Sequence, residues 1–234
     1  MINIITGSSR GVGKALANHF LEKGEKVVGI SRQNEIEHPN FTFVKCDFTE
    51  KQQLYDLDLS VFADPENYPV RLFNNAGIIG EIKRSHELTL THYTDVAMVN
   101  IVATQFLCSY TLQTFGFDNV DTIVNISSGA GERPVPSWAA YCASKAAVNL
   151  FSETLKAEIE ELGKSTKIYS IAPGVVDTNM QVAIRNSSPK DFSGQQNFID
   201  LKENDELRTP EEVAILLDEF LREDHTDLGV IHRI

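Results

Sequence analysis

Short apolar runs alternate with longer stretches of helical periodicity along most of the chain. The apolar runs predict strands over residues 2–5, 26–31, 41–46, 70–73, 122–126, 167–172 and 229–232. Apolar residues at helical spacing predict helices over residues 11–23, 90–115, 137–162 and 210–221. A parallel sheet needs a crossover after each strand, and a helix usually provides it. The pattern therefore predicts one α/β domain over residues 1–234, with about seven parallel strands and helices on both faces.

The pattern weakens after Pro173-Gly174, which interrupts the chain behind a predicted strand. Residues 178–208 are polar and irregular, with no strong period. Pro210 then opens the last predicted helix, where a proline suits the first turn. We therefore expect a long irregular segment over residues 178–208, and long connections of this kind are often functional.

Composition narrows the classes of partner. The 234 residues include 33 acidic and 21 basic side chains, which gives a formal net charge of −12 at pH 7. A phosphate backbone would repel such a chain, so nucleic acid is not an expected partner, and the charge also favours solubility. No apolar run approaches the roughly 20 residues of a membrane helix, and the first strand does not resemble a signal peptide.

The cysteines and histidines indicate a compartment and argue against a metal site. Cys46, Cys108 and Cys142 are scattered and odd in number, which favours a reducing cytoplasm. The six histidines show no metal-ligand spacing, so no bound metal is expected.

A glycine-rich segment, Thr6-Gly7-Ser8-Ser9-Arg10-Gly11-Val12-Gly13, lies between the first predicted strand and the first predicted helix. Glycines allow a tight turn close to a pyrophosphate, whose charge is favoured at a helix N-terminus. An ordinary turn is the alternative for this segment alone.

The second strand ends in Ser31-Arg32, without the acid that would bind the ribose hydroxyls of NAD. Arg32 and Arg10 can instead clamp a 2′-phosphate, which favours NADPH unless both are only solvated surface residues.

Ser128, Tyr141 and Lys145 are the strongest candidates for chemistry. Tyr141 and Lys145 lie four residues apart on one predicted helix and share a face, and Ser128 follows a strand at the edge where doubly wound sheets bind ligands. A free tyrosine with a pKa of about 10 transfers protons poorly at neutral pH, and a nearby ammonium is expected to lower that pKa. Tyr141 would then protonate a carbonyl oxygen that Ser128 orients, while a cofactor delivers hydride. A Tyr-x-x-x-Lys pair occurs often by chance, and surface packing is the better explanation of such a pair when it stands alone.

Taken in order, T-G-x-x-x-G-x-G at residues 6–13, Asn74-Asn75-Ala76-Gly77, Ser128 and the Tyr141–Lys145 pair resemble the short-chain dehydrogenase/reductase family. The resemblance covers nearly the whole chain and implies a Rossmann-type, doubly wound parallel sheet. It implies that Asn100 holds a proton-relay water beside the three catalytic residues, a buried structural Asn being the alternative. It also implies that NADPH or NADP+ contacts a set of residues distributed over the whole chain, namely Thr6, Gly7, Ser9, Arg10, Gly11, Val12, Gly13, Ser31, Arg32, Asp47, Phe48, Asn75, Ala76, Gly77, Tyr141, Lys145, Pro173, Gly174, Val176 and Thr178.

The late sequence resembles one branch of that family, which contains sepiapterin reductase and bacterial reductases of benzil and other diketones. Residues 177–181, 184–185, 191–192 and 201–203 carry this likeness, together with Gly129-Ala130-Gly131. The resemblance implies that residues 178–208 form a substrate lid. It implies substrate contacts from Ser128, Trp138, Tyr141, Met180 and Ile184, with Phe198 nearby. Ordinary loop packing is the alternative for Met180, Ile184 and Phe198.

The expected activity is therefore reduction of a ketone or a 1,2-diketone by NADPH. Sepiapterin is the alternative substrate, but residues 229–234 contain no acid to anchor a pterin, and Arg233 stands where that acid is expected. A non-catalytic NADPH-sensing protein is a lower alternative, which the presence of all three catalytic residues disfavours. The two long helices resemble those that pair subunits in this family, which implies a homodimer.

Overall fold

The computed structural model describes residues 1–63, 68–223, 225 and 228–234. Within them, seven parallel strands form one sheet in the order β3-β2-β1-β4-β5-β6-β7. The strand order reverses between β1 and β4, and in sheets of this kind ligands bind in the crevice at that point. The bounds of the strands are Ile2–Thr6 (β1), Lys26–Ser31 (β2), Phe41–Lys45 (β3), Val70–Asn74 (β4), Val120–Ile126 (β5), Lys167–Ala172 (β6) and Ile231–Arg233 (β7).

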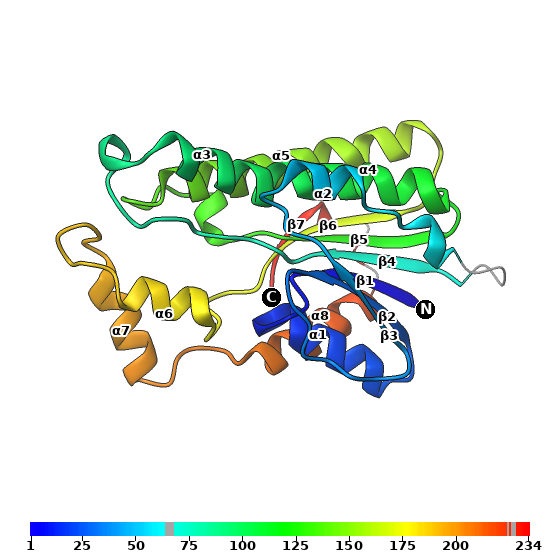
Figure 1. Ribbon diagram of the computed structural model, residues 1–234, viewed down its shortest axis with the longest axis horizontal. Helices are drawn as coiled ribbons and strands as arrows, with labels where there is room; N and C mark the ends of the chain where they lie inside the picture. Colours follow the sequence, from blue (N-terminus) through cyan, green and yellow to red (C-terminus); the bar gives the residue numbers. More distant parts are fainter. Residues whose placement is uncertain (64–67, 224, 226–227) are drawn as a thin grey trace.

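Helices cover both faces of the sheet (Figure 1). On one face, α1 (Gly11–Glu22) and α8 (Pro210–Arg222) pack on the sheet. On the other lie α2 (Lys51–Tyr55), α3 (Leu90–Ala97), α4 (Ala103–Phe115) and α5 (Ala139–Glu161). All five residues of β1 are buried because the sheet is covered on both sides, which explains why the central strands are continuous apolar runs. The predicted fold class, a Rossmann-type doubly wound α/β sheet, is confirmed.

Two predicted segments differ from the structure. The expected helix over residues 90–115 contains a π-helical turn, Met98–Val102, between α3 and α4. The expected irregular segment over residues 178–208 was wrong, because it contains α6 (Asn179–Arg185) and α7 (Gln195–Glu203). Helices of seven and nine residues contain too few turns to show a clear period in the sequence. Three short 3₁₀ turns, Ser60–Phe62, Ser85–Glu87 and Gly129–Gly131, complete the elements of the described residues.

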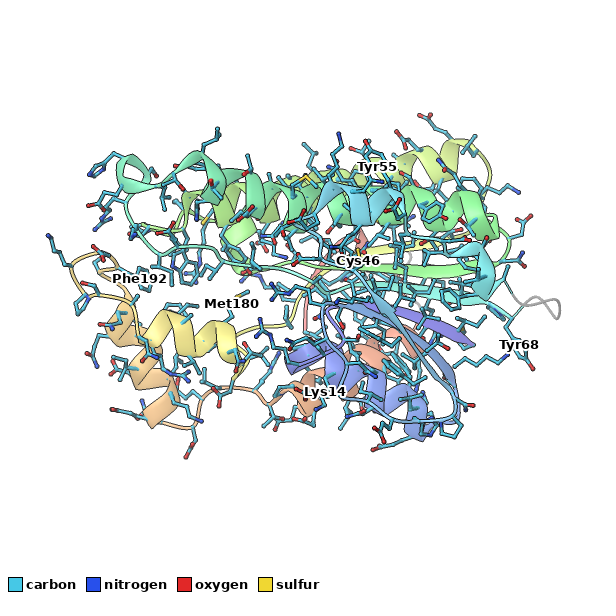
Figure 2. All side chains as sticks on the ribbon, viewed as in Figure 1. Lys14, Cys46, Tyr55, Tyr68, Met180 and Phe192 are labelled. Atoms are coloured by element: carbon cyan, nitrogen blue, oxygen red, sulfur yellow. The ribbon has the colours of Figure 1, made fainter. Side chains whose placement is uncertain are left out.

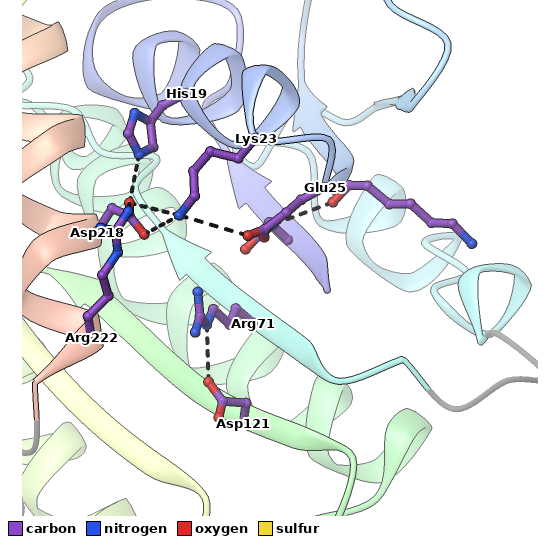
Figure 3. A network of polar contacts seen from close by, with 9 residues as sticks. His19, Lys23, Glu25, Arg71, Asp121, Asp218 and Arg222 are labelled. Carbon is purple, nitrogen blue, oxygen red and sulfur yellow. Dashed lines mark hydrogen bonds and ion pairs between the residues drawn. The ribbon is translucent and has the colours of Figure 1, made fainter.

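A network of polar contacts around the buried Asp218 joins α1 to α8 (Figure 3). The Asp218 carboxylate accepts hydrogen bonds from His19 Nε2 at 2.9 Å, from Lys23 Nζ at 2.9 Å and from Arg222 Nη2 at 2.5 Å. Burial by itself raises the pKa of Asp218, but these hydrogen bonds outweigh it and bring the pKa down to about 2. The helix that follows the glycine-rich segment is thereby fixed to the last helix.

In the part of the chain that the structure describes, no helix is both long enough and apolar enough to span a bilayer.

Candidate active site

The glycine-rich segment forms the turn between β1 and α1. Gly7 and Gly11 have φ values of 69° and 54°, in the left-handed region that favours glycine. At Gly13 a Cβ atom would lie 2.3 Å from the Gly7 carbonyl oxygen and 2.5 Å from Asn75 Nδ2, so no larger residue fits there. No side chain caps the N-terminus of α1 in the described residues, which leaves its first N–H groups directed at the crevice.

The segment after β4 is tied directly to this turn. Asn75 Nδ2 donates to the Thr6 carbonyl at 3.0 Å, and the Ala76 N–H donates to Thr6 Oγ1 at 2.9 Å. Thr6 is buried, and its hydroxyl donates in turn to the Phe73 carbonyl. Thr6 and Asn75 therefore hold two loops of the crevice at a constant separation.

Two arginines line the crevice, Arg32 directly after β2 and Arg10 directly before α1. Arg32 is 59% exposed, and its Nη1 lies 3.9 Å from Asp47 Oδ2. Arg10 is exposed and lines the same cavity. Glu35 is the first acid after β2, and its carboxylate is already bound by Lys14 Nζ at 2.7 Å. This part of the crevice is therefore suited to an anionic group.

Ser128, Tyr141 and Lys145 come together in the same cavity. Lys145 Nζ lies 5.7 Å from the centroid of the Tyr141 ring and donates to the Ile126 carbonyl at 2.7 Å. Tyr141 and Lys145 are both buried on α5, as their spacing predicts. Ser128 follows β5. Its Oγ accepts a hydrogen bond from the Ala130 N–H at 3.2 Å, and its hydroxyl lies close enough to Tyr141 to lower the pKa of that phenol.

The electrostatics of this group differ from the expectation. Burial raises the pKa of Tyr141 to about 12, and the hydrogen bond from Ser128 offsets only part of that effect. Burial also lowers the pKa of Lys145 to about 8. The expected lowering of the Tyr141 pKa by the ammonium was therefore wrong, because removal of the phenol from water dominates. Tyr141 keeps its proton at neutral pH.

Asn100 occupies the π-helical turn, a feature that often marks functional sites. Its Nδ2 donates to the Ile78 carbonyl and to Ser144 Oγ, both at 2.9 Å, and its Oδ1 accepts from the Ile78 N–H at 2.9 Å. Ser144 Oγ donates to the Tyr141 carbonyl at 2.7 Å. Both amide hydrogens of Asn100 thus join the segment after β4 to α5. Ser144, which takes part in this connection, is a site residue that the sequence analysis missed.

The segment from Pro173 to Thr178 closes the crevice beyond β6. Arg208 holds it: its Nη1 donates to the Pro173 carbonyl at 3.1 Å, and its N–H donates to the Val175 carbonyl at 3.1 Å. The Asp177 N–H donates back to the Arg208 carbonyl at 2.9 Å. Arg208 was missed because nothing local in the sequence links it to residues more than 30 positions away.

An apolar chamber adjoins Tyr141 beneath α6 and α7. Trp138 forms its centre, with ring centroids 6.0 Å from Tyr141, 5.2 Å from Phe192 and 5.5 Å from Phe198. Figure 2 shows the labelled Phe192 and Met180 on the side of segment 178–208 that faces the rest of the molecule. Phe192 is another wall residue that the sequence did not single out, since isolated aromatic residues occur in many loops. Ile79, Ala130 and Ile184 complete the buried wall.

One cavity of about 1540 Å³ contains the crevice and the chamber. Most of the expected site residues line it. Thr6, Gly13 and Asn100 do not, and they hold the surrounding loops instead. In the described residues, no group of three or more His, Cys, Asp or Glu side chains could hold a metal ion.

The chain is similar to several known proteins. The family described as short chain dehydrogenase matches residues 2–189. Benzil reductase ((S)-benzoin forming) from Bacillus subtilis is 36% identical over 99% of this chain and 97% of that protein, and its counterpart from Bacillus cereus is 34% identical over 99% and 98%. Sepiapterin reductase from Bos taurus is 33% identical over 87% of this chain and 83% of that protein. The solved structure of the KRED1-Pglu enzyme covers 99% of both chains at 27% identity, with a TM-score of 0.87.

Proposed function

Because the chain belongs to the short-chain dehydrogenase family and is an oxidoreductase of that kind, we propose that it is an NADPH-dependent carbonyl reductase for aryl 1,2-diketones. The observation that carries this proposal is Tyr141, a buried phenol that keeps its proton, at the boundary between a nucleotide-sized crevice and an aromatic chamber. A protonated donor beside an apolar substrate site is what carbonyl reduction requires.

In this mechanism the bound cofactor supplies a hydride to the carbonyl carbon. The Ser128 hydroxyl orients the carbonyl oxygen toward Tyr141, and Tyr141 donates its proton to that oxygen. The Lys145 ammonium, 5.7 Å from the ring centroid, then stabilises the phenolate. Asn100 and Ser144 keep Tyr141 in position through the Tyr141 carbonyl.

Preference for NADPH rests on the two arginines. Arg10 and Arg32 offer guanidinium groups to a 2′-phosphate, and the ribose-binding acid of NAD enzymes is absent from the end of β2. Asp47, 3.9 Å from Arg32, orients that guanidinium over the crevice. Thr178 and Val176, on the segment that closes over the crevice, are proposed to contact the nicotinamide.

The chamber supports a flat aromatic substrate. Trp138, Phe192 and Phe198 present ring surfaces to it, and the relatives named benzil reductase act on a diaryl diketone. Met180 and Ile184, on α6, are proposed to contact the same substrate. Aromatic packing of this kind needs no polar anchor.

Sepiapterin is a second candidate substrate, because a relative of the chain is named for that activity. A pterin needs a carboxylate for its guanidine-like edge, and two of the acids near the chamber are engaged in ion pairs. Glu132 binds Arg233 at 2.7 Å, and Asp177 binds Arg185 at 3.3 Å and Lys202 at 2.8 Å. Each unpaired group of a buried pterin would cost about 1–3 kcal/mol. We expect kcat/KM to be higher for benzil or 1-phenyl-1,2-propanedione than for sepiapterin with the same NADPH, and the reverse order would refute the diketone assignment.

The proton donor is tested by Tyr141→Phe, which keeps the ring and removes the hydroxyl. NADPH binding should persist while turnover falls by roughly 100-fold or more. Tyr55→Phe, which changes an exposed ring outside the cavity, is the matched control and should keep full turnover (Figure 2). Turnover of Tyr141→Phe near that of the unchanged protein would refute the mechanism. NADPH binding without consumption in a panel of diketones would favour an NADPH sensor instead.

The proposal includes pairing of two copies through α4 and α5. Val102, which directly precedes α4, and Leu150 on α5 are exposed. It also includes a reducing cytoplasm, in which Cys46, Cys108 and Cys142 stay free thiols. Sedimentation analysis that finds only a monomer would refute the dimer.

A further inference from the structure

Ser137, which directly precedes the tryptophan of the chamber, has an unusual backbone conformation. Its φ is 73°, and among the described residues only Ser137 and Asp205 have a positive φ without being glycine. A residue with a Cβ is strained there, and such strain persists only where surrounding contacts enforce it. Ser137 is 7% exposed. A specific contact must therefore hold it.

That contact is a hydrogen bond to the lid. Ser137 Oγ donates to the Asp191 carbonyl at 2.5 Å. Asp191 lies in the connection between α6 and α7, and the ring of the next residue, Phe192, packs 5.2 Å from the ring of Trp138. Two consecutive residues before α5 thus meet two consecutive residues of the lid.

No other hydrogen bond within the described residues joins segment 186–194 to the body of the protein. The two helices of the lid are anchored separately: Arg185 on α6 and Lys202 on α7 both bind the carboxylate of Asp177. Apart from the bonds of Arg208 at its C-terminal end, the lid is therefore fixed by ion pairs at Asp177 beside the crevice and by Ser137 across the chamber.

We propose that Ser137 is a positioning and specificity-determining residue, whose bond to Asp191 holds Phe192 and Phe198 against Trp138 and so adapts the chamber to aryl ketones. The contact acts just before the N-terminus of α5, four residues before Tyr141. An aryl substrate needs the ring surfaces of Trp138, Phe192 and Phe198 packed together, whereas a small aliphatic diketone does not. The role of Ser137 in substrate preference rests on the proposed reductase function. Its role in holding the lid against Trp138 does not depend on that function.

Trp138 is a direct reporter because it is the one tryptophan of the chain. It is 7% exposed, so acrylamide should quench its fluorescence weakly. In Ser137→Ala the bond is lost, and we expect the quenching constant to rise at least about 2-fold. Ser187→Ala is the matched control, because Ser187 Oγ donates to the Ile184 carbonyl inside the lid at 2.7 Å. Its quenching constant should equal that of the unchanged protein.

The Ser137→Gly variant distinguishes two roles of Ser137, namely holding the lid through its hydroxyl and forming the turn before α5. Glycine adopts a positive φ without strain, so this variant should fold well although it lacks the hydroxyl. If the bond matters, Ser137→Gly shows the same increase in quenching as Ser137→Ala. The KM for 1-phenyl-1,2-propanedione should then rise about 10-fold in both variants, while the values for 2,3-butanedione and for NADPH stay within about 2-fold.

If Ser137→Gly instead keeps the quenching and the aryl preference of the unchanged protein, Ser137 only forms a turn and the inference is wrong. Absence of diketone reduction in the unchanged protein would refute the proposed function and the specificity role. Quenching would still decide whether the Ser137 bond holds the lid.

Discussion

The buried carboxylate of Asp218 allows a quantitative prediction. Asp218 is 2% exposed and accepts hydrogen bonds from three side chains of α1 and α8 (Figure 3). Asp218→Ala removes the one carboxylate that these three side chains share. Loss of one partner of a buried ion pair typically costs about 3–5 kcal/mol. His19, Lys23 and Arg222 keep some contact with water, so we expect the lower end, about 3 kcal/mol.

For a chain of this length each kcal/mol lowers Tm by about 2–4 °C, so Tm should fall by about 6–12 °C. The matched control is Asp118→Ala. Asp118 is 84% exposed and pairs with Lys164 at 3.1 Å, and such a surface pair contributes at most about 1 kcal/mol. Urea unfolding at pH 7 gives the free energy of unfolding of both variants.

The pH dependence adds an independent measurement. The folded pKa of Asp218, about 2, lies below its ordinary value of 3.8, so its contribution to stability is present above about pH 4 and is lost as the pH falls toward 2. Asp218→Ala should therefore lose less stability than the unchanged protein between pH 4 and pH 2. A loss at pH 7 no larger than that of Asp118→Ala, or an unchanged acid dependence, would refute the reasoning.

Three further predictions concern the site. The single-turnover rate of reduction should be constant between pH 6 and 7.5, because Tyr141 keeps its proton with a pKa of about 12, and should fall above about pH 8 as Lys145 loses its charge. A rate that falls below pH 7 would contradict this assignment. Arg32→Asp should weaken NADPH binding far more than NADH binding, and titration calorimetry that finds equal losses would remove the main support for NADPH. Gly13→Ala should abolish nucleotide binding, because its Cβ would lie 2.5 Å from Asn75 Nδ2, and a dissociation constant within about 2-fold of the unchanged protein would show that the turn can adapt.

The sequence determined the features that depend on local pattern. The bounds of β2 and β6 match their predicted ranges residue for residue, because buried strands are continuous apolar runs between polar turns. Tyr141 and Lys145 share a face of α5 because helix geometry alone requires it at a spacing of four residues. Glycines in the turn after β1 were recognisable because few other residues permit that backbone.

Tertiary structure decided what depends on residues that are distant in the chain. Burial reverses the expected pKa shift of Tyr141, and burial is a property of the packed domain, not of a spacing. Asp218 meets His19 across 199 residues, and Ser137 meets Asp191 across 54, so no local pattern contains either contact. The short helices α6 and α7 also depend on tertiary structure, because packing against the chamber supplies the stability that so few turns lack by themselves.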